Sequence, residues 1–201
     1  MTEPVRDVRH LPNYAFGSRS PIWWGNIGFI VIEASGFFML IMVYLYLASQ
    51  NADWPMTGDL PRPLIGSLLV GYLVLSEIPN TWIKREIRRF DLKRVRIAIA
   101  IMSLIALGGL AIRAFEFGAL NCRWDLNAYG SIVWALLFMH TFHLITDALE
   151  TCVFCAIMFI GPVDARRFVD VGENAEYWDF VVLAWIPVYA VIYWAPRWLG
   201  S

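Results

Sequence analysis

The sequence contains few charged residues. Asp, Glu, Lys and Arg make up 16% of the 201 residues, whereas 59% of the residues are hydrophobic. A soluble domain has about 25% charged residues, and a soluble fold could not cover this much apolar surface. No Pro/Ser-rich linker or low-complexity stretch divides the chain. The composition therefore predicts one domain that is embedded in a membrane.

Motifs for redox centres are also missing. The three cysteines do not make a disulfide framework. The sequence has neither a CxxCH motif for heme attachment nor a cysteine cluster for iron and sulfur. The net charge of -1 gives no reason to expect nucleic acid as a partner. We therefore expect a chain that binds no redox cofactor itself.

The first 21 residues lack the features of a secretory signal. They contain five charged residues and no apolar h-region, which a cleavable signal requires. We expect residues 1–21 to form a cytoplasmic segment and the first membrane helix to direct insertion.

Five long apolar runs are present instead. A membrane-spanning helix needs about 20 mostly apolar residues. The expected spans lie near residues 22–48, 64–83, 95–117, 131–160 and 177–199. The predicted fold is therefore all-α, a bundle of five transmembrane helices in a single domain that covers residues 22–201.

The basic residues predict the orientation of this bundle. Positively charged loops tend to stay cytoplasmic. Twelve of the 16 Lys and Arg residues lie before the first span, around the loop between the second and third spans, or between the fourth and fifth spans. We expect the N-terminus inside and the C-terminus outside, in a multi-pass protein of a bacterial plasma membrane.

Several tryptophans are expected to contact lipid or the membrane interface. Tryptophan favours the headgroup layer near the ends of membrane helices. The residues assigned to this role are Trp23, Trp24, Trp82, Trp178 and Trp185.

Glu33 lies near the middle of the first span. An ionisable side chain at membrane depth costs roughly 2.5 to 3.5 kcal/mol on insertion scales, so it normally faces the bundle interior. Its own helix offers no charged neighbour. We therefore expect Glu33 to be neutral or to have a partner on another helix, either for function or as a structural hydrogen bond.

Four polar residues on the fourth span form a stripe. His140, His143, Asp147 and Glu150 are three, four and three residues apart, which places them on one helical face. Two histidines and a carboxylate can supply part of a metal site. A di-iron bundle, however, would need Glu-x-x-His from two helices, and the sequence lacks this motif. The favoured interpretation is a polar seam without metal.

Two further pairs carry simpler interpretations. Arg113 and Glu116, three residues apart near the outer end of the third span, are expected to pair. Cys152 and Cys155 form a CxxC pair inside the fourth span, and Cys152 lies about 18 Å along the helix from His140. We interpret the cysteines as buried apolar residues.

A set of residues in fixed order extends over nearly the whole chain. It comprises Glu33 in the first helix, Thr81-Trp82 ending the second, Glu116 ending the third, Tyr129-Gly130-Ser131 leading into His140-x-x-His143, and Tyr177-Trp178, Trp185, Val188-Tyr189 and Ile192-Tyr193-Trp194 in the last. In this order and on these helices, the residues resemble subunit III of the heme-copper oxidases, the third subunits of cytochrome c and quinol oxidases.

The resemblance implies an accessory subunit of an aerobic respiratory complex that is not catalytic by itself. Such a subunit stabilises catalytic subunit I, accompanies subunit II, holds structural phospholipid in a cleft and supports proton uptake, while heme and copper lie in the catalytic subunit. Glu33 would match the buried carboxylate of the family, and His140 and His143 its histidine pair. Longer members have seven helices around a V-shaped cleft, so this chain would lack the first two, and one wall of the cleft would be missing or supplied by another subunit.

The chain also departs from the family pattern. The family often has a histidine where Asp179 stands and an acid where Val182 stands, and it usually has neutral residues at positions 147 and 150. Three alternative functions therefore remain. The chain could be a subunit III relative that accompanies nitric oxide reductases, a small membrane metalloenzyme, or a proton transporter in which Glu33 and Asp147 relay protons. The candidate proton-related, lipid-related or buried polar residues are Glu33, Glu116, His140, His143, Asp147 and Glu150, and none is expected to be catalytic.

Overall fold

The computed structural model describes residues 16–56 and 60–199, and these residues contain no strand. The helices are α1 (Pro21–Gln50), α2 (Pro63–Arg88), α3 (Leu92–Gly118), α4 (Ala128–Ile160) and α5 (Ala165–Tyr189), followed by the π-helix η1 (Ala190–Trp194) and α6 (Ala195–Leu199). The last three run on as one span, so the described part of the chain has five segments long and apolar enough to cross a membrane. The predicted all-α membrane bundle is confirmed, although most of the predicted cytoplasmic segment lies outside the described residues.

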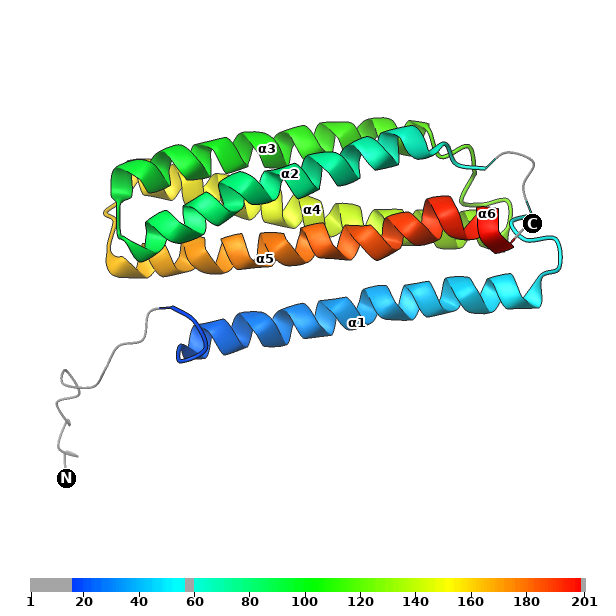
Figure 1. Ribbon diagram of the computed structural model, residues 1–201, viewed down its shortest axis with the longest axis horizontal. Helices are drawn as coiled ribbons and strands as arrows, with labels where there is room; N and C mark the ends of the chain where they lie inside the picture. The colour runs from blue at the N-terminus through cyan, green and yellow to red at the C-terminus, as the bar shows by residue number, and fades with distance from the viewer. Residues whose placement is uncertain (1–15, 57–59, 200–201) are drawn as a thin grey trace, which may run out of the picture.

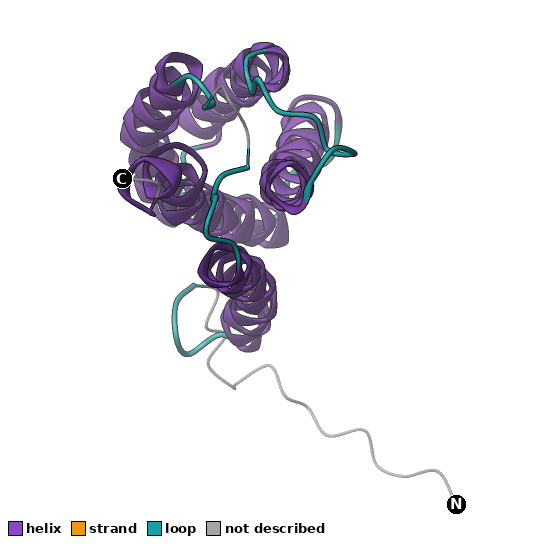
Figure 2. Ribbon diagram, turned by 90° about the vertical axis from the view of Figure 1, so that its right-hand side faces the viewer, coloured by secondary structure: helices purple, strands orange, loops and turns teal. Residues whose placement is uncertain are grey.

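Four helices form a ring and the fifth lies outside it. Helices α2, α3, α4 and α5 each pack on the next and close on α2, whereas α1 packs against α4 and α5 (Figure 2). Figure 1 shows α1 running alongside the ring from one end to the other. The start of α1 and the α2–α3 and α4–α5 connections share one end, which we call the basic end. Its residues include Lys84, Arg85, Arg88, Arg89, Lys93, Arg94, Arg96, Arg166 and Arg167.

Local sequence explains where the helices begin. Asp91, Asn127 and Asp164 each accept a hydrogen bond from the backbone N–H three residues on, which caps the start of α3, α4 and α5. Helices α1 and α2 begin with proline, whose missing N–H costs nothing at the first helical position.

Helix α5 begins at Ala165, well before the predicted start of the fifth span near residue 177. Its first turns carry Asp170, Glu173 and Glu176, which lower the hydropathy of the segment. The same turns bury Phe168 and Val171, three residues apart on one face. The predicted span near residues 177–199 covers only the apolar part of this longer helix, whose first turns are amphipathic.

Trp178 and Trp185 lie inside the bundle. They are 1% and 0% exposed, so the prediction that they contact lipid or the interface was wrong. The indole N–H of Trp178 donates to Ser76 at 2.8 Å, and Trp185 packs on His140 with 4.8 Å between ring centroids. Hydropathy cannot distinguish the bundle face of a membrane helix from its lipid face. The other three tryptophans of this group remain at least partly exposed: Trp23, Trp24 and Trp82.

The outer surface of the bundle is apolar. Among the 30 residues of α1, only Phe37 and Tyr44 are buried. Each of the other four spans also exposes large apolar side chains, such as Leu104 on α3 and Leu149 on α4. Surface of this kind suits contact with lipid or with another membrane subunit.

Candidate functional site

The two histidines of α4 face different neighbours. Helix α4 packs against α1, α3 and α5, so residues three apart on its inner face meet different helices. His143 lies beside Glu33 of α1, whereas His140 contacts Arg113 of α3. The stripe predicted on the fourth span is therefore divided between two polar clusters.

The first cluster, which we call the open cluster, consists of Glu33, His143 and Tyr177. The hydroxyl of Tyr177 donates to Oε2 of Glu33, and Nε2 of His143 is 3.5 Å from the same oxygen. Nδ1 of His143 is 2.7 Å from the carbonyl oxygen of Met139. A carbonyl only accepts, so Nδ1 carries the proton and Nε2 remains to face the carboxyl group. The expected partners of Glu33 on other helices are thus present.

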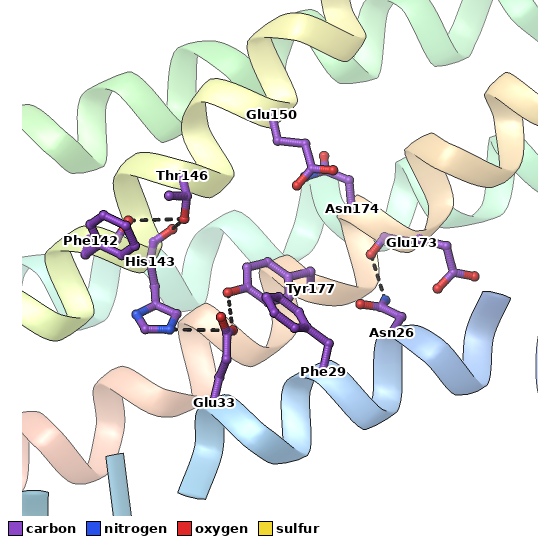
Figure 3. Close-up of a pocket in the computed structure, with 10 residues that line it drawn as sticks. All are labelled: Asn26, Phe29, Glu33, Phe142, His143, Thr146, Glu150, Glu173, Asn174 and Tyr177. Atoms are coloured by element: carbon purple, nitrogen blue, oxygen red, sulfur yellow. Dashed lines mark hydrogen bonds and ion pairs between the residues drawn. The ribbon is translucent and has the colours of Figure 1, made fainter. Parts of the chain in front are cut away.

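The open cluster lines a pocket between α1, α4 and α5. The pocket has a volume of about 330 Å³, and Figure 3 shows Glu33 and His143 pointing toward each other beside the ring of Tyr177. Polar and aromatic side chains from all three helices form its wall: Asn26, Phe29, Glu33, Phe142, His143, Thr146, Glu150, Glu173, Asn174 and Tyr177. A carboxyl group inside the membrane is therefore accessible to a small molecule.

Asp147 lies behind this wall. It is 1% exposed, and its Oδ1 accepts a hydrogen bond of 2.8 Å from Asn174. Asn174 in turn accepts from the hydroxyl of Thr151 at 3.0 Å. Asp147 is thus held by α5 away from Glu33, while Glu150, one turn further along α4, reaches the pocket (Figure 3).

The second cluster, which we call the closed cluster, consists of Arg113, Glu116, His140 and Tyr193. Nη1 of Arg113 is 2.6 Å from Oε2 of Glu116, so the predicted pair is confirmed. The hydroxyl of Tyr193 donates to Oε1 of Glu116 at 2.5 Å. Every member is at most 1% exposed, so the closed cluster is sealed from solvent and lipid.

His140 completes the closed cluster as a neutral ring. Its Nε2 is 2.9 Å from the carbonyl oxygen of Val181, so Nε2 carries the proton and Nδ1 accepts from Nη2 of Arg113 at 2.7 Å. The guanidinium also lies 3.9 Å from the centre of the Trp185 ring, a cation–π contact. One cation and one anion are thereby matched inside the bundle.

Sequence reasoning missed several of these partners. Asn174 fell between the predicted fourth and fifth spans. Tyr177 and Tyr193 entered only as parts of a motif. For Asn174 and Tyr177, the signal available in the sequence was helical spacing from other buried residues of α5, since Asn174, Tyr177, Val181 and Trp185 recur at three- or four-residue intervals.

The described residues contain no group of three His, Cys, Asp or Glu side chains arranged to hold a metal ion. The ring nitrogens of His140 and His143 contact different protein groups: Arg113 and Val181 O for His140, and Met139 O and Glu33 for His143. Cys152 and Cys155 are free and half-buried, so they are less enclosed than the interpretation as buried apolar residues expected.

The comparisons with known proteins agree with the resemblance read from the sequence. No family model matches the chain. Cytochrome c oxidase subunit 3 of Xenopus laevis is 28% identical to this chain over 194 residues, which cover 92% of this chain and 72% of that protein. The protein of the same name from Pylaiella littoralis is 22% identical over 200 residues, 94% of this chain and 72% of that protein. That of Bacillus sp. (strain PS3) is 20% identical over 166 residues, 78% of this chain and 77% of that protein.

Proposed function

We propose, from the premise that this chain is a relative of subunit III of the heme-copper oxidases, that it is an accessory subunit that binds no redox cofactor itself. In this role it packs on catalytic subunit I, in a complex that includes subunit II, and the heme and copper lie in those partners. The observation that carries the proposal is the similarity to three proteins of one name over 78% or more of the chain.

The internal contacts support this assignment. Glu33, Glu116, His140 and His143 carry much of the resemblance, and all four take part in polar contacts between helices. Side chains that hold helices together in this way are costly to replace, because a buried polar group without a partner loses about 1 to 3 kcal/mol.

The surface of α1 supports a role in assembly and lipid binding. With only two buried residues, most of its apolar side chains remain for phospholipid and for the catalytic subunit. Covering them would stabilise both partners. We place the structural phospholipid on this face.

The open cluster supports a role in proton uptake. Glu33 lies 12 residues after the start of α1, about 18 Å along the helix, at a depth where ionisable groups usually serve function. The pocket reaches its carboxyl group, and Nε2 of His143 provides a second proton acceptor beside it. Protons can therefore be held and exchanged at this position.

The distribution of basic residues supports a cytoplasmic N-terminus. The basic end carries at least nine Lys and Arg residues, whereas Arg62, Arg123 and Arg197 lie at the opposite end. In a chain whose three native cysteines are replaced by serine, a cysteine placed at Ser18 should resist a membrane-impermeant maleimide in intact cells, and one placed at Asp53 should react. The reverse pattern would invert the assignment.

Affinity purification from native membranes in mild detergent tests the assembly. We expect a large catalytic subunit to copurify, identified by mass spectrometry, and heme bands in the optical spectrum. Recovery of the chain alone, without heme, would refute the proposal. Consumption of oxygen or of nitric oxide by the purified complex separates an oxygen-reducing complex from one that reduces nitric oxide.

Turnover of that complex tests the role of Glu33. Glu33→Gln should lower sustained turnover while leaving the subunit assembled, because the amide keeps the size of the side chain but cannot exchange a proton. Glu176→Gln on α5, an acid outside the pocket, serves as the matched control. Equal turnover of the two variants would exclude a proton role for Glu33.

A further inference from the structure

A small cavity, which we call the ring cavity, lies between the four helices of the ring. Residues of α2, α3, α4 and α5 line it: Asn80, Ile83, Ile99, Met102, Thr151, Asn174, Ala175 and Trp178. Its volume of about 10 Å³ is at the lower limit of about 10 to 15 Å³ that one water molecule requires. The ring cavity therefore has room for one water molecule and for no larger ligand.

Asn80 presents an unpartnered oxygen to this cavity. The residue is 0% exposed, and its Nδ2 donates to the carbonyl oxygen of Ala175 at 2.9 Å and to Oδ1 of Asp179 at 2.8 Å. Because a backbone carbonyl only accepts hydrogen bonds, the nitrogen of the amide must be the atom that faces it. Oδ1 is then the polar atom that Asn80 has left for the cavity, and no described residue donates a hydrogen bond to it.

The depth of Asn80 makes a partner for this oxygen necessary. Asn80 lies eight residues before the end of α2 at Arg88, about 12 Å along the helix. Helix α2 has 26 residues and a length of about 39 Å, which exceeds the roughly 30 Å hydrocarbon core. Asn80 is therefore within the hydrocarbon layer, where bulk water cannot satisfy a polar group and an unpaired one is costly.

Two other side chains of the ring cavity can bind the same water molecule. Nδ2 of Asn174 donates to Oδ1 of Asp147 at 2.8 Å, and its second N–H has no acceptor among the described residues. Oγ1 of Thr151 donates to Oδ1 of Asn174 at 3.0 Å and keeps its lone pairs as acceptors. With Asn80, the lining offers one donor and two acceptors, and a buried water typically makes about three hydrogen bonds.

We propose that the ring cavity binds one water molecule, which donates to Asn80 and Thr151 and accepts a hydrogen bond from Asn174. The water satisfies the amide oxygen of Asn80 and joins α2 to α4 and α5. This assignment rests on the cavity and its contacts and not on the proposed place in an oxidase, so the two can fail separately.

The bound water also completes a polar connection through the bundle. On one side of the cavity, Asn80 contacts Asp179, which forms a partly exposed ion pair with Lys84. On the other side, Asn174 donates to Asp147 and lines the pocket of the open cluster. One water molecule therefore links the polar groups near the basic end with those behind the open cluster.

Hydroxyl-radical footprinting by X-ray radiolysis tests the proposal on the full chain, purified with whatever partners accompany it. Radiolysis generates radicals from a bound water itself, so side chains beside a buried water are oxidised although bulk solvent does not reach them. Met102 and Trp178 line the ring cavity, whereas Met158 and Trp185 are similarly buried and do not. We expect severalfold faster oxidation of Met102 than of Met158, and of Trp178 than of Trp185. Equal rates within both pairs would overturn the proposal.

Variants link this oxidation to the water site. Asn80→Leu removes the unpartnered oxygen, and Thr151→Val removes a second acceptor without changing the shape of the side chain. Each should lower the oxidation rate of Met102 severalfold. Ser103→Ala serves as the matched control, because Ser103 is a buried hydroxyl that donates to Ile99 O and does not line the cavity.

Circular dichroism checks that the variants fold, and Thr151→Val retains the test if Asn80→Leu does not, because Asn80 also holds Ala175 and Asp179. The proposal is overturned if Thr151→Val leaves the oxidation of Met102 unchanged, or if Ser103→Ala lowers it as much. An experimental structure of the complex that shows ordered waters provides a second measurement. Density within hydrogen-bond distance of Oδ1 of Asn80 would support the site, and its absence would refute it.

Discussion

The closed and open clusters contain the same kinds of side chain in different surroundings. Each has one histidine of α4, one tyrosine from the α5–η1 segment and one glutamate from a neighbouring helix. The closed cluster adds Arg113 and is sealed, whereas the open cluster has no arginine and borders a pocket. The presence of a matching cation separates the two.

This difference assigns separate roles to the clusters. The buried ion pair, which also bonds to His140 and Tyr193, holds α3, α4 and η1 in one arrangement, because any displacement leaves a charge unpaired. A glutamate beside a pocket can change its proton or its ligand without moving a helix. Variants that change one side chain of either cluster at a time should therefore show different effects: a loss of stability in the closed cluster and a change of function in the open cluster.

The largest effect is expected for Arg113→Met. The change leaves Glu116 buried without its cation, and breaking a buried pair costs about 3 to 5 kcal/mol. Unfolding in mixed micelles, followed by circular dichroism, should show a loss of this size in the free energy of unfolding. The double variant Arg113→Met/Glu116→Met should recover much of it, and His143→Met in the open cluster should cost less. If Arg113→Met alone is as stable as the parent, the closed cluster does not stabilise the fold.

A smaller effect is expected when one hydroxyl is removed from each cluster. Tyr193→Phe removes the donor to Glu116 at a site that water cannot reach, so the loss should be about 1.5 to 3 kcal/mol. Tyr177→Phe removes the donor to Glu33 beside the pocket, where water or a ligand can replace it. Thermal unfolding of the two variants provides the comparison, and equal losses would show that the pocket does not solvate Glu33.

The sequence predicted the bundle well because long apolar runs need no tertiary information. It also predicted the Arg113–Glu116 pair, since both residues lie on one helix three positions apart. It could not place His140 and Tyr193 beside that pair, because those contacts depend on how α3, α4 and η1 are rotated against each other.

The same limit explains the wrong assignments. Trp178 and Trp185 are apolar on any scale, and only the packing of α5 against α2 and α4 shows that they are buried. The early turns of α5 fell outside the predicted fifth span because acids lower their hydropathy. Two residues of the pocket wall, Glu173 and Asn174, were therefore out of reach.

Two glycines differ in the space around them: Gly66 lies against the closed cluster, whereas Gly28 lies on the open surface of α1. A Cβ at Gly66 would lie 2.5 Å from the Tyr193 ring and 3.0 Å from Oε1 of Glu116, so Gly66→Ala presses on the closed cluster. Overpacking of this kind costs about 1 to 3 kcal/mol. Gly28→Ala on α1 has no neighbour within 4 Å and should leave the melting temperature unchanged or slightly higher. A neutral Gly66→Ala would mean that the closed cluster can shift without loss.

The smallest effect is expected at the exposed pair Arg123–Asp125, which has the same charges as the buried pair. Nη2 of Arg123 is 2.7 Å from Oδ2 of Asp125, and the guanidinium lowers the pKa of this carboxyl below its ordinary value of 3.8. A lowered pKa stabilises the folded state at neutral pH, and this contribution is lost as the pH falls through the acid range. Solvent screens the pair, so Asp125→Asn should barely lower the melting temperature at pH 7 and should not differ from the parent once the pH has fallen below the lowered pKa of Asp125. A loss at pH 7 comparable to that of Arg113→Met would show that charge pairing, and not enclosure, distinguishes the closed cluster.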